Sequence, residues 1–99
     1  MAIVEISVTP LGIGKMGVSP YVAECLKLAR ESGLKYQLTS MGTIIEGDAS
    51  LLFPLLQQMH ESPFSVGVKR VSTLIKIDDR RDCEHSMQGK VESVLAKLK

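Results

Sequence analysis

The segment VSTLIKIDDRRD, from Val71 to Asp82, decides the fold. Its first part alternates along the chain, as a strand with two different faces does. One face carries Val71, Thr73, Ile75 and Ile77, and the other carries Ser72, Leu74, Lys76 and Asp78. Five consecutive charges follow, and so many ionised side chains do not bury for packing. The pattern predicts a strand over Lys69–Asp78, a charged corner, and a last helix that begins near Asp82.

Periodicity and turn residues place the other elements. Ser19-Pro20 is a strong helix start, with Ser19 as the N-cap, and Gly33 stands where that helix would stop. Asp48 is a plausible cap for a second helix. Three further strands are predicted at Ala2–Thr9, Tyr36–Met41 and Thr43–Gly47. The order β-α-β-β-α-β with an additional C-terminal helix is the ferredoxin-like α+β pattern, an antiparallel sheet with two helices on one face.

Prolines are expected to limit several elements. Pro10 should end the first strand, and Pro54 should kink the second helix or delay its start. Pro63 should end or bend that helix near Ser62. The last helix has apolar residues at helical spacing, with acids at its beginning and Lys97 and Lys99 at its end, an arrangement that suits the helix dipole.

Strand parity predicts a half-polar surface. The two helices need the apolar faces of the first and fourth strands, so the opposite sheet face should remain open. The first and fourth strands are neighbours in this fold. Four polar residues should therefore cluster on that open face, with Ile3 and Leu74 as its apolar members: Glu5, Ser7, Ser72 and Lys76.

Bulk properties exclude several classes. The 99 residues suit a single ferredoxin-like domain over residues 1–99 with a thin core. A net charge of +1 and four aromatic residues give no footprint for nucleic acid. No apolar run approaches the roughly 18 residues of a membrane span. The chain enters a strand without a leader, and Cys25 and Cys83 form no CxxC pair, so we expect a cytoplasmic protein with two idle thiols.

Two sequence features resemble known chemical motifs, a nucleotide-binding loop and a metal site, but each departs from what its motif requires. Gly12, Gly14 and Gly17 spell GxGxxG, but the helix starts later, and the acid expected about 20 residues on is missing. A loop at the edge of a pocket or interface fits better. Asp78, Asp79, Asp82 and His85 offer metal ligands, yet Arg80 and Arg81 oppose a cation, so no metal site is expected. A salt-bridged corner is favoured there, and an anion at the two arginines is the alternative.

Polar strand residues are the better candidates for binding. Glu5, Ser7, Thr43 and Glu46 are either ordinary exposed positions or groups that line a pocket for a small cationic or amine-bearing ring. Adaptable apolar walls would come from Leu11, Met16 and Met41. No nucleophile is tied by spacing to a base and an acid, so no catalytic residues are assigned.

The chain resembles the small thiamine-binding family with a ferredoxin-like fold, formerly a domain of unknown function. The resemblance covers essentially the whole chain and is carried by ISVTPLG, SPYVAE, YQLTSMGTIIEGD, KRVSTLIKIDDRRD and KVESV. It implies a non-enzymatic protein without a cofactor that binds thiamine or its hydroxymethylpyrimidine moiety. It also implies a homodimer or homotetramer assembled through the open sheet face and the terminal helix. The matching motifs give six ligand-binding candidates: Ser7, Thr9, Met41, Gly42, Thr43 and Glu46.

Three candidate functions are compatible with these observations. The favoured one is an oligomeric small-molecule-binding protein. The alternative is a structural or regulatory module that assembles through sheet packing without a small ligand. An enzyme is the third, and it would need a nucleophile or base that the sequence does not show.

Overall fold

The computed structural model describes residues 1–14 and 17–98. Its core is a four-stranded antiparallel sheet in the order β2-β3-β1-β4. The elements along the chain are β1 (Ala2–Leu11), α1 (Ser19–Glu31), β2 (Lys35–Thr39), β3 (Gly42–Gly47), α2 (Ala49–Glu61), the short 3-10 helix η2 (Phe64–Val66), β4 (Arg70–Asp79) and α3 (Met87–Ala96). This arrangement confirms the predicted ferredoxin-like α+β fold.

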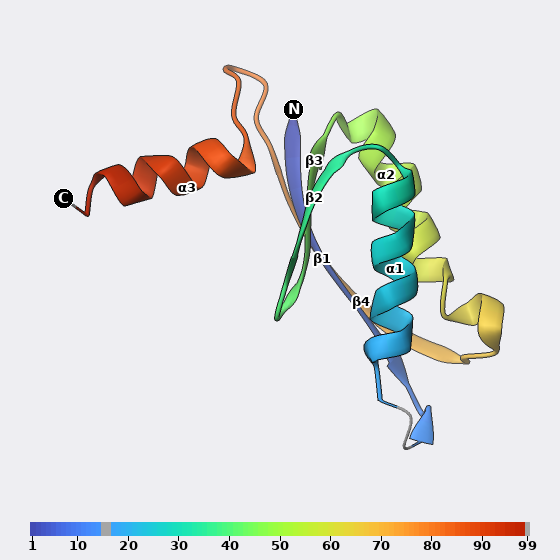
Figure 1. Cartoon of the computed structure of the whole chain (residues 1–99). Coiled ribbons are helices and arrows are strands. Elements are labelled where there is room, and N and C mark those ends of the chain that lie inside the picture. Colours follow the sequence, from blue (N-terminus) through green and yellow to red (C-terminus); the bar gives the residue numbers. More distant parts are fainter. Residues whose placement is uncertain (15–16, 99) are drawn as a thin grey trace.

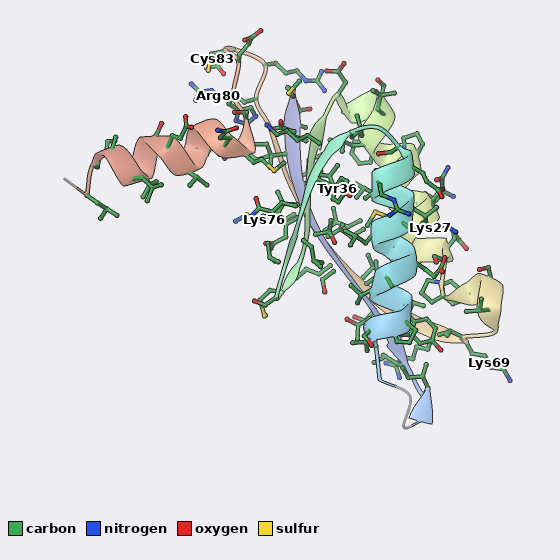
Figure 2. All side chains as sticks on the ribbon, in the orientation of Figure 1. Lys27, Tyr36, Lys69, Lys76, Arg80 and Cys83 are labelled. Carbon is green, nitrogen blue, oxygen red and sulfur yellow. The ribbon has the colours of Figure 1, made fainter. Side chains whose placement is uncertain are left out.

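Helices α1 and α2 cover one face of the sheet, and α3 projects from the other (Figure 1). The buried core lies between the sheet and the first two helices and confirms the predicted parity. It comprises Ala2, Val4, Ile6, Cys25, Ala29, Ile45, Leu52, Leu55, Leu56 and Met59. Tyr36 lies on this side and Lys76 on the opposite one (Figure 2). The face without α1 and α2 is called the open face below.

The register between β1 and β4 brings the predicted polar residues together on the open face. In the pairing of β1 with β4, Glu5 lies opposite Lys76 and Thr9 lies opposite Ser72. Ser7 lies opposite Leu74, whose side chain is 72% exposed. The open face is therefore half polar, as predicted.

The first strand runs through Pro10 to Leu11, so the prediction that Pro10 ends it is wrong. Met1 and Arg80 exchange backbone hydrogen bonds. Because hydrogen-bonded pairs recur at every second residue of an antiparallel ladder, the odd-numbered residues of β1 are the ones whose main chain bonds to β4. The even-numbered residues of β1 direct their main-chain N–H and C=O groups toward β3, and the pairing of β3 with β1 stops at Ile6. The missing N–H of Pro10 therefore costs no ladder bond.

Helix α2 starts directly after Asp48 and continues through Pro54, so a delayed start is wrong. Asp48 occupies the predicted N-cap position with an extended backbone, but its side chain makes no capping hydrogen bond. Pro54 lies on the exposed side of the helix, and so does Ser50, whose carbonyl loses its intrahelical partner. Solvent can bond that carbonyl. The helix ends at the predicted place, with Ser62 as its C-cap.

Two predicted helix starts are shifted. Helix α1 has Val18 as its N-cap, so Ser19 is the first helical residue and makes no side-chain cap. Helix α3 begins at Met87, not near Asp82, because Ser86 caps it by accepting a hydrogen bond from the Gly89 amide at 2.9 Å. No acid lies in its first turn. Lys99 lies outside the described residues.

His60 is half-buried near the end of α2. Its Nδ1 lies 2.7 Å from the Thr73 hydroxyl, and its ring meets Phe64 edge-on. It therefore joins α2 to β4. Within residues 1–14 and 17–98, no helix is long and apolar enough to cross a membrane.

Candidate functional site

A cavity of about 170 Å³ lies where β3 stops pairing with β1. Its walls are the end of β1, the first turns of α1, and the tip of the β2–β3 hairpin. We call it the hairpin slot. It is lined by Ile6, Ser7, Val8, Thr9, Val18, Val22, Cys25, Leu38, Thr39, Ser40, Met41, Gly42, Thr43 and Met59.

Unequal strand lengths create the slot. The β1 strand pairs with β4 along all ten residues, but with β3 only from Ala2 to Ile6. Among the residues that the structure describes, no strand therefore lies beside β1 beyond Ile6 on the β3 side. A strand edge without a partner presents unpaired main-chain groups.

Val8 supplies those main-chain groups. Even-numbered residues of β1 direct N–H and C=O toward β3, and no β3 residue pairs with Val8. Its amide and carbonyl therefore face the slot as one donor and one acceptor. Sequence reasoning missed this, although a proline two residues later in the same strand signals an edge without a ladder partner.

Gly42 closes the slot against β1. A Cβ built on this glycine would lie 2.7 Å from the Ile6 carbonyl oxygen, a distance that real side chains do not tolerate. The turn before it is fixed by the Thr39 hydroxyl, which donates to the Gly42 carbonyl at 2.8 Å and accepts from the Met41 amide at 3.2 Å. The hairpin tip is thereby held against the strand.

Five of the six predicted ligand-binding residues meet at this slot: Ser7, Thr9, Met41, Gly42 and Thr43. The Thr43 side chain is buried at 3% exposure, whereas Met41 is 79% exposed at the mouth. Of the predicted apolar walls, Leu11 lies at a separate hollow near Tyr21, and Met16 lies outside the described residues. Val18 and Val22 of α1 form a wall in their place.

Glu46, the sixth predicted residue, lies elsewhere. It is three residues from Thr43 in β3 and so points to the open face. It is only 9% exposed, and its Oε2 accepts a hydrogen bond from the Met87 amide at 2.9 Å. Because a carboxylate is favourable at a helix N-terminus, Glu46 anchors α3.

The slot is nearly uncharged. Among the described residues that line it, the one ionisable side chain is Cys25, whose thiol donates to the Met59 carbonyl at 3.4 Å. Burial, with a smaller contribution from Glu24, raises the pKa of this thiol to about 11. Cys25 is therefore a neutral floor residue at pH 7, not a nucleophile. Such a site suits an uncharged polar ring.

The charged corner, Asp78–Asp82, forms ion pairs with itself and with α3. Arg80 bonds Asp82 at 2.7 Å, Arg81 bonds Asp79 at 2.7 Å, and Lys90 bonds Asp78. These hydrogen bonds hold the pKa of all three carboxyl groups below the ordinary value. Among the residues the structure describes, no cluster of three His, Cys, Asp or Glu side chains fits a metal ion.

Helix α3 has an unpartnered apolar stripe. None of its residues is buried, and Val91, Val94 and Leu95 are more than half exposed, as is Leu98 just after the helix. Apart from the Glu46 anchor, its start is tied to the open face by Lys35 with Gln88, and Lys90 with Asp78. These contacts are polar, so the stripe remains free to bury against something else.

Comparisons with known proteins agree with this architecture. The family model described as thiamine-binding protein matches residues 4–95. The UPF0045 protein YqgV of Bacillus subtilis is 46% identical over 98 residues, covering 95% of this chain and 94% of the relative. A UPF0045 protein of Methanothermobacter thermautotrophicus is 36% identical, covering 99% of this chain and all of the relative.

Solved structures show the same fold. The hypothetical protein MJ1052 of Methanocaldococcus jannaschii superposes with a TM-score of 0.84 at 32% identity, covering 94% of each chain. A candidate thiamine biosynthesis or salvage protein of Thermotoga maritima has a TM-score of 0.78, covering 94% of this chain and 97% of that one. At 17% identity this second likeness concerns the fold alone. With a family model that spans almost its whole length, the chain belongs to the thiamine-binding protein family.

Proposed function

We propose that this chain is a non-catalytic, oligomeric protein that binds thiamine or its hydroxymethylpyrimidine moiety in the hairpin slot. The observation that carries the proposal is the meeting of five residues at one cavity: Ser7, Thr9, Met41, Gly42 and Thr43. The sequence motifs alone predict all five. Membership in a thiamine-binding family supports the same ligand class.

The unpaired edge at Val8 fits an aminopyrimidine. Such a ring places an exocyclic amine, a donor, beside a ring nitrogen, an acceptor. The Val8 carbonyl and amide form the complementary pair, in the way that an added strand is recognised at a sheet edge. The hydroxyl of Thr43, which lines the slot on the helix-covered side of the sheet, can orient a remaining polar atom of the ring.

Size favours the pyrimidine over the whole of thiamine. Ligand pockets usually measure about 300–1,000 Å³, whereas the slot has about 170 Å³. One six-membered ring enters, and the thiazolium ring stays at the mouth beside Met41 and Leu38, which are 79% and 50% exposed. The carboxylate of Glu5, on the neighbouring open face, is placed to offset the thiazolium charge.

Assembly completes the site. The α3 stripe and the apolar residues of the open face are exposed in one chain, and together they would bury each other between two copies. The open face then packs against a second subunit, which walls off the mouth of the slot. No reacting group is required, because the neutral thiol and the hydroxyls only shape and bond the ligand.

Calorimetric titration with hydroxymethylpyrimidine and with thiamine tests the proposal. Replacing Thr43 by Val keeps the shape and removes a hydroxyl, so we expect about a twofold to tenfold loss of affinity, in line with about 0.5–1.5 kcal/mol for one neutral hydrogen bond. Gly42→Ala should remove binding, because its Cβ forces the hairpin away from Ile6.

Ser72→Ala is the matched control, since Ser72 is an exposed hydroxyl residue on β4, outside the slot. Its affinity should equal that of the unmodified protein. Absence of heat and of any thermal shift with both ligands at millimolar concentration would contradict the proposal. Oligomers in light scattering under those conditions would instead favour the interaction module without a small ligand.

A further inference from the structure

One stripe at the start of helix α1 lines the hairpin slot from its mouth to its floor. Val18, Val22 and Cys25 are spaced by four and three residues, which places their side chains on one face of the helix. Val18 is 44% exposed at the mouth, whereas Cys25 is 4% exposed and lies at the floor. Met59 of α2, which is 1% exposed, lines the same end. The slot is therefore closed where Cys25 contacts Met59.

A proline in α2 determines where the proton of the Cys25 thiol goes. In an α-helix, the carbonyl of each residue accepts a hydrogen bond from the amide four residues later. For Met59 that residue is Pro63, which has no N–H. The Cys25 thiol donates to the Met59 carbonyl at 3.4 Å instead. Because burial raises the pKa of this thiol to about 11, the thiol keeps that proton at pH 7. It therefore faces the slot as an apolar group.

The two sides of the slot differ in polarity. The strand side carries the N–H and C=O of Val8, at the part of β1 that β3 leaves unpaired, and the Thr43 hydroxyl. Of the described residues that α1 and its N-cap contribute to the lining, two are valines and the third is Cys25, whose thiol is already bonded. A ring in the slot therefore finds its hydrogen bonds at the strands and apolar contacts at the helix.

We propose that Cys25, together with Met59, selects the substituent at carbon 2 of the bound aminopyrimidine and accepts a methyl group there. This inference rests on the proposed function, because it concerns the same slot and ligand class. Carbons 2 and 5 of a pyrimidine lie opposite each other across the ring. Thiamine carries its thiazolium at carbon 5, and that ring stays at the mouth because the slot, at about 170 Å³, holds one ring. The methyl group at carbon 2 then points to the floor.

A methyl group suits this floor better than a polar or a larger group. Sulfur is polarisable and packs well against apolar atoms. An amino group would bring two donors to a place where the Met59 carbonyl already has one. A longer alkyl chain would overlap Cys25, which is held where α1 packs on α2. The floor thus discriminates by polarity and by size.

A ligand series in calorimetric titration tests the inference on the unmodified protein. It consists of hydroxymethylpyrimidine and three analogues with hydrogen, amino or propyl in place of the methyl group at carbon 2. The hydrogen analogue should bind about fourfold more weakly, which is the effect of one buried methyl-sized group. The amino and propyl analogues should bind at least tenfold more weakly. This series needs no substitution, so it decides even if a variant at the floor does not fold.

Cys25→Ala should reverse those preferences. It makes room for the propyl group, and it leaves the Met59 carbonyl without a donor that an amino group of the ligand can supply. Both analogues should therefore gain at least tenfold relative to hydroxymethylpyrimidine. Cys25→Ser is the matched variant, because its hydroxyl keeps a donor for the carbonyl, and it should gain no preference for the amino analogue. Lys27→Ala, on the exposed side of α1 (Figure 2), should leave all four affinities unchanged.

The S–H stretching band in the infrared spectrum gives a second readout. In a Cys83→Ser background, Cys25 supplies the single thiol of the chain. Its band should show a hydrogen-bonded thiol both without ligand and with hydroxymethylpyrimidine, because a methyl group does not compete for the Met59 carbonyl.

The outcomes separate the two claims. Absence of hydroxymethylpyrimidine binding would overturn the proposed function and this inference with it. If hydroxymethylpyrimidine binds, three results would overturn the inference alone: equal affinity for the amino or propyl analogue, unaltered preferences in a folded Cys25→Ala protein, or the band of a free thiol.

Discussion

The two faces of the sheet hold their helices by different forces. On the covered face, α1 and α2 bury an apolar core in which Val4, Ile45 and Leu52 are fully shielded. On the open face, α3 buries none of its residues and is tied by polar contacts at its start. The first arrangement is stable within one chain, whereas the second leaves apolar surface that only another molecule can cover.

The two faces show that the residues that stabilise the fold differ from those available for binding. Buried apolar contacts specify the ferredoxin-like body, and the hairpin slot is built into that body by the length of β1. Leu74 of β4 and the apolar residues of α3 contribute little to the body, because solvent reaches most of their surface. We propose that assembly with a second copy explains their sequence.

The largest expected effect compares one substitution on the two faces. Leu52→Ala removes a fully buried side chain from α2 and should lower the free energy of unfolding by about 2–5 kcal/mol. Leu95→Ala removes the same atoms from α3, where the side chain is 55% exposed, and should change it by less than about 0.5 kcal/mol at low protein concentration. Urea denaturation measures both.

Protein concentration sharpens this test. If α3 buries its stripe against a second copy, the cost of Leu95→Ala should grow with concentration, because association stabilises only the folded chain. The cost of Leu52→Ala should not. A Leu95→Ala protein as destabilised as Leu52→Ala in dilute solution would mean that α3 belongs to the body of the single chain.

A smaller effect is expected at the anchor of α3. Glu46→Ala removes the carboxylate that accepts the Met87 amide and should favour local opening of α3 by about 1–2 kcal/mol. Glu46→Gln keeps a hydrogen-bond acceptor, so its local opening of α3 should be intermediate between those of the unmodified protein and Glu46→Ala. Hydrogen exchange at the amides of Met87 to Val91 reports the opening.

Gln88→Ala is the control, because its contacts with Lys35 and Glu92 are exposed and should contribute little. The same titration with hydroxymethylpyrimidine distinguishes two roles for Glu46. If Glu46→Ala loses hydroxymethylpyrimidine binding while amide exchange at the start of α3 is unchanged, Glu46 belongs to the ligand site, as the sequence predicted. Faster exchange with retained affinity would establish it as the anchor.

The strands and helices could be predicted where burial dictates the pattern. The alternation along the first and fourth strands, with Val4, Ile6 and Ile75 on the apolar side, predicted both sheet faces, and the order of elements followed. The slot residues on β1 and the hairpin came from motifs, and the structure gathers five of them. Strand parity alone already placed Glu46 and Thr43 on opposite faces, a consequence that the sequence interpretation did not use.

Other features depend on contacts that sequence periodicity does not encode. The start of α3 is set by Ser86 and by Glu46, which is 41 residues away from the amide it accepts. The charges from Asp78 to Asp82 suggested a helix start, but β4 continues to Asp79, and the arginines that follow pair with Asp79 and Asp82 in the loop before α3. The walls from Val18 and Val22 required knowledge of how α1 lies over β1.

The smallest expected effect is the acid response of the charged corner. Hydrogen bonds from Lys90, Arg81 and Arg80 lower the pKa values of Asp78, Asp79 and Asp82, respectively. A carboxyl group whose folded-state pKa is lowered stabilises the fold above its unfolded value, 3.8 here, and loses that contribution as the pH falls through the folded value. We therefore expect the loop after β4 and the start of α3 to loosen below about pH 4, while the core under α1 and α2 stays closed.

Amide exchange of Cys83 to Gly89, compared with that of Leu52 to Met59, measures the difference between the two regions. Asp78→Asn supplies the control, since it removes the acceptor of Lys90 and should loosen the start of α3 already at pH 7. Because all three pairs are exposed, added salt at pH 7 should imitate part of the acid effect. An α3 that keeps its protection in acid and in salt would show that apolar burial, not the charged corner, holds this helix, and the contrast between the two faces would then disappear.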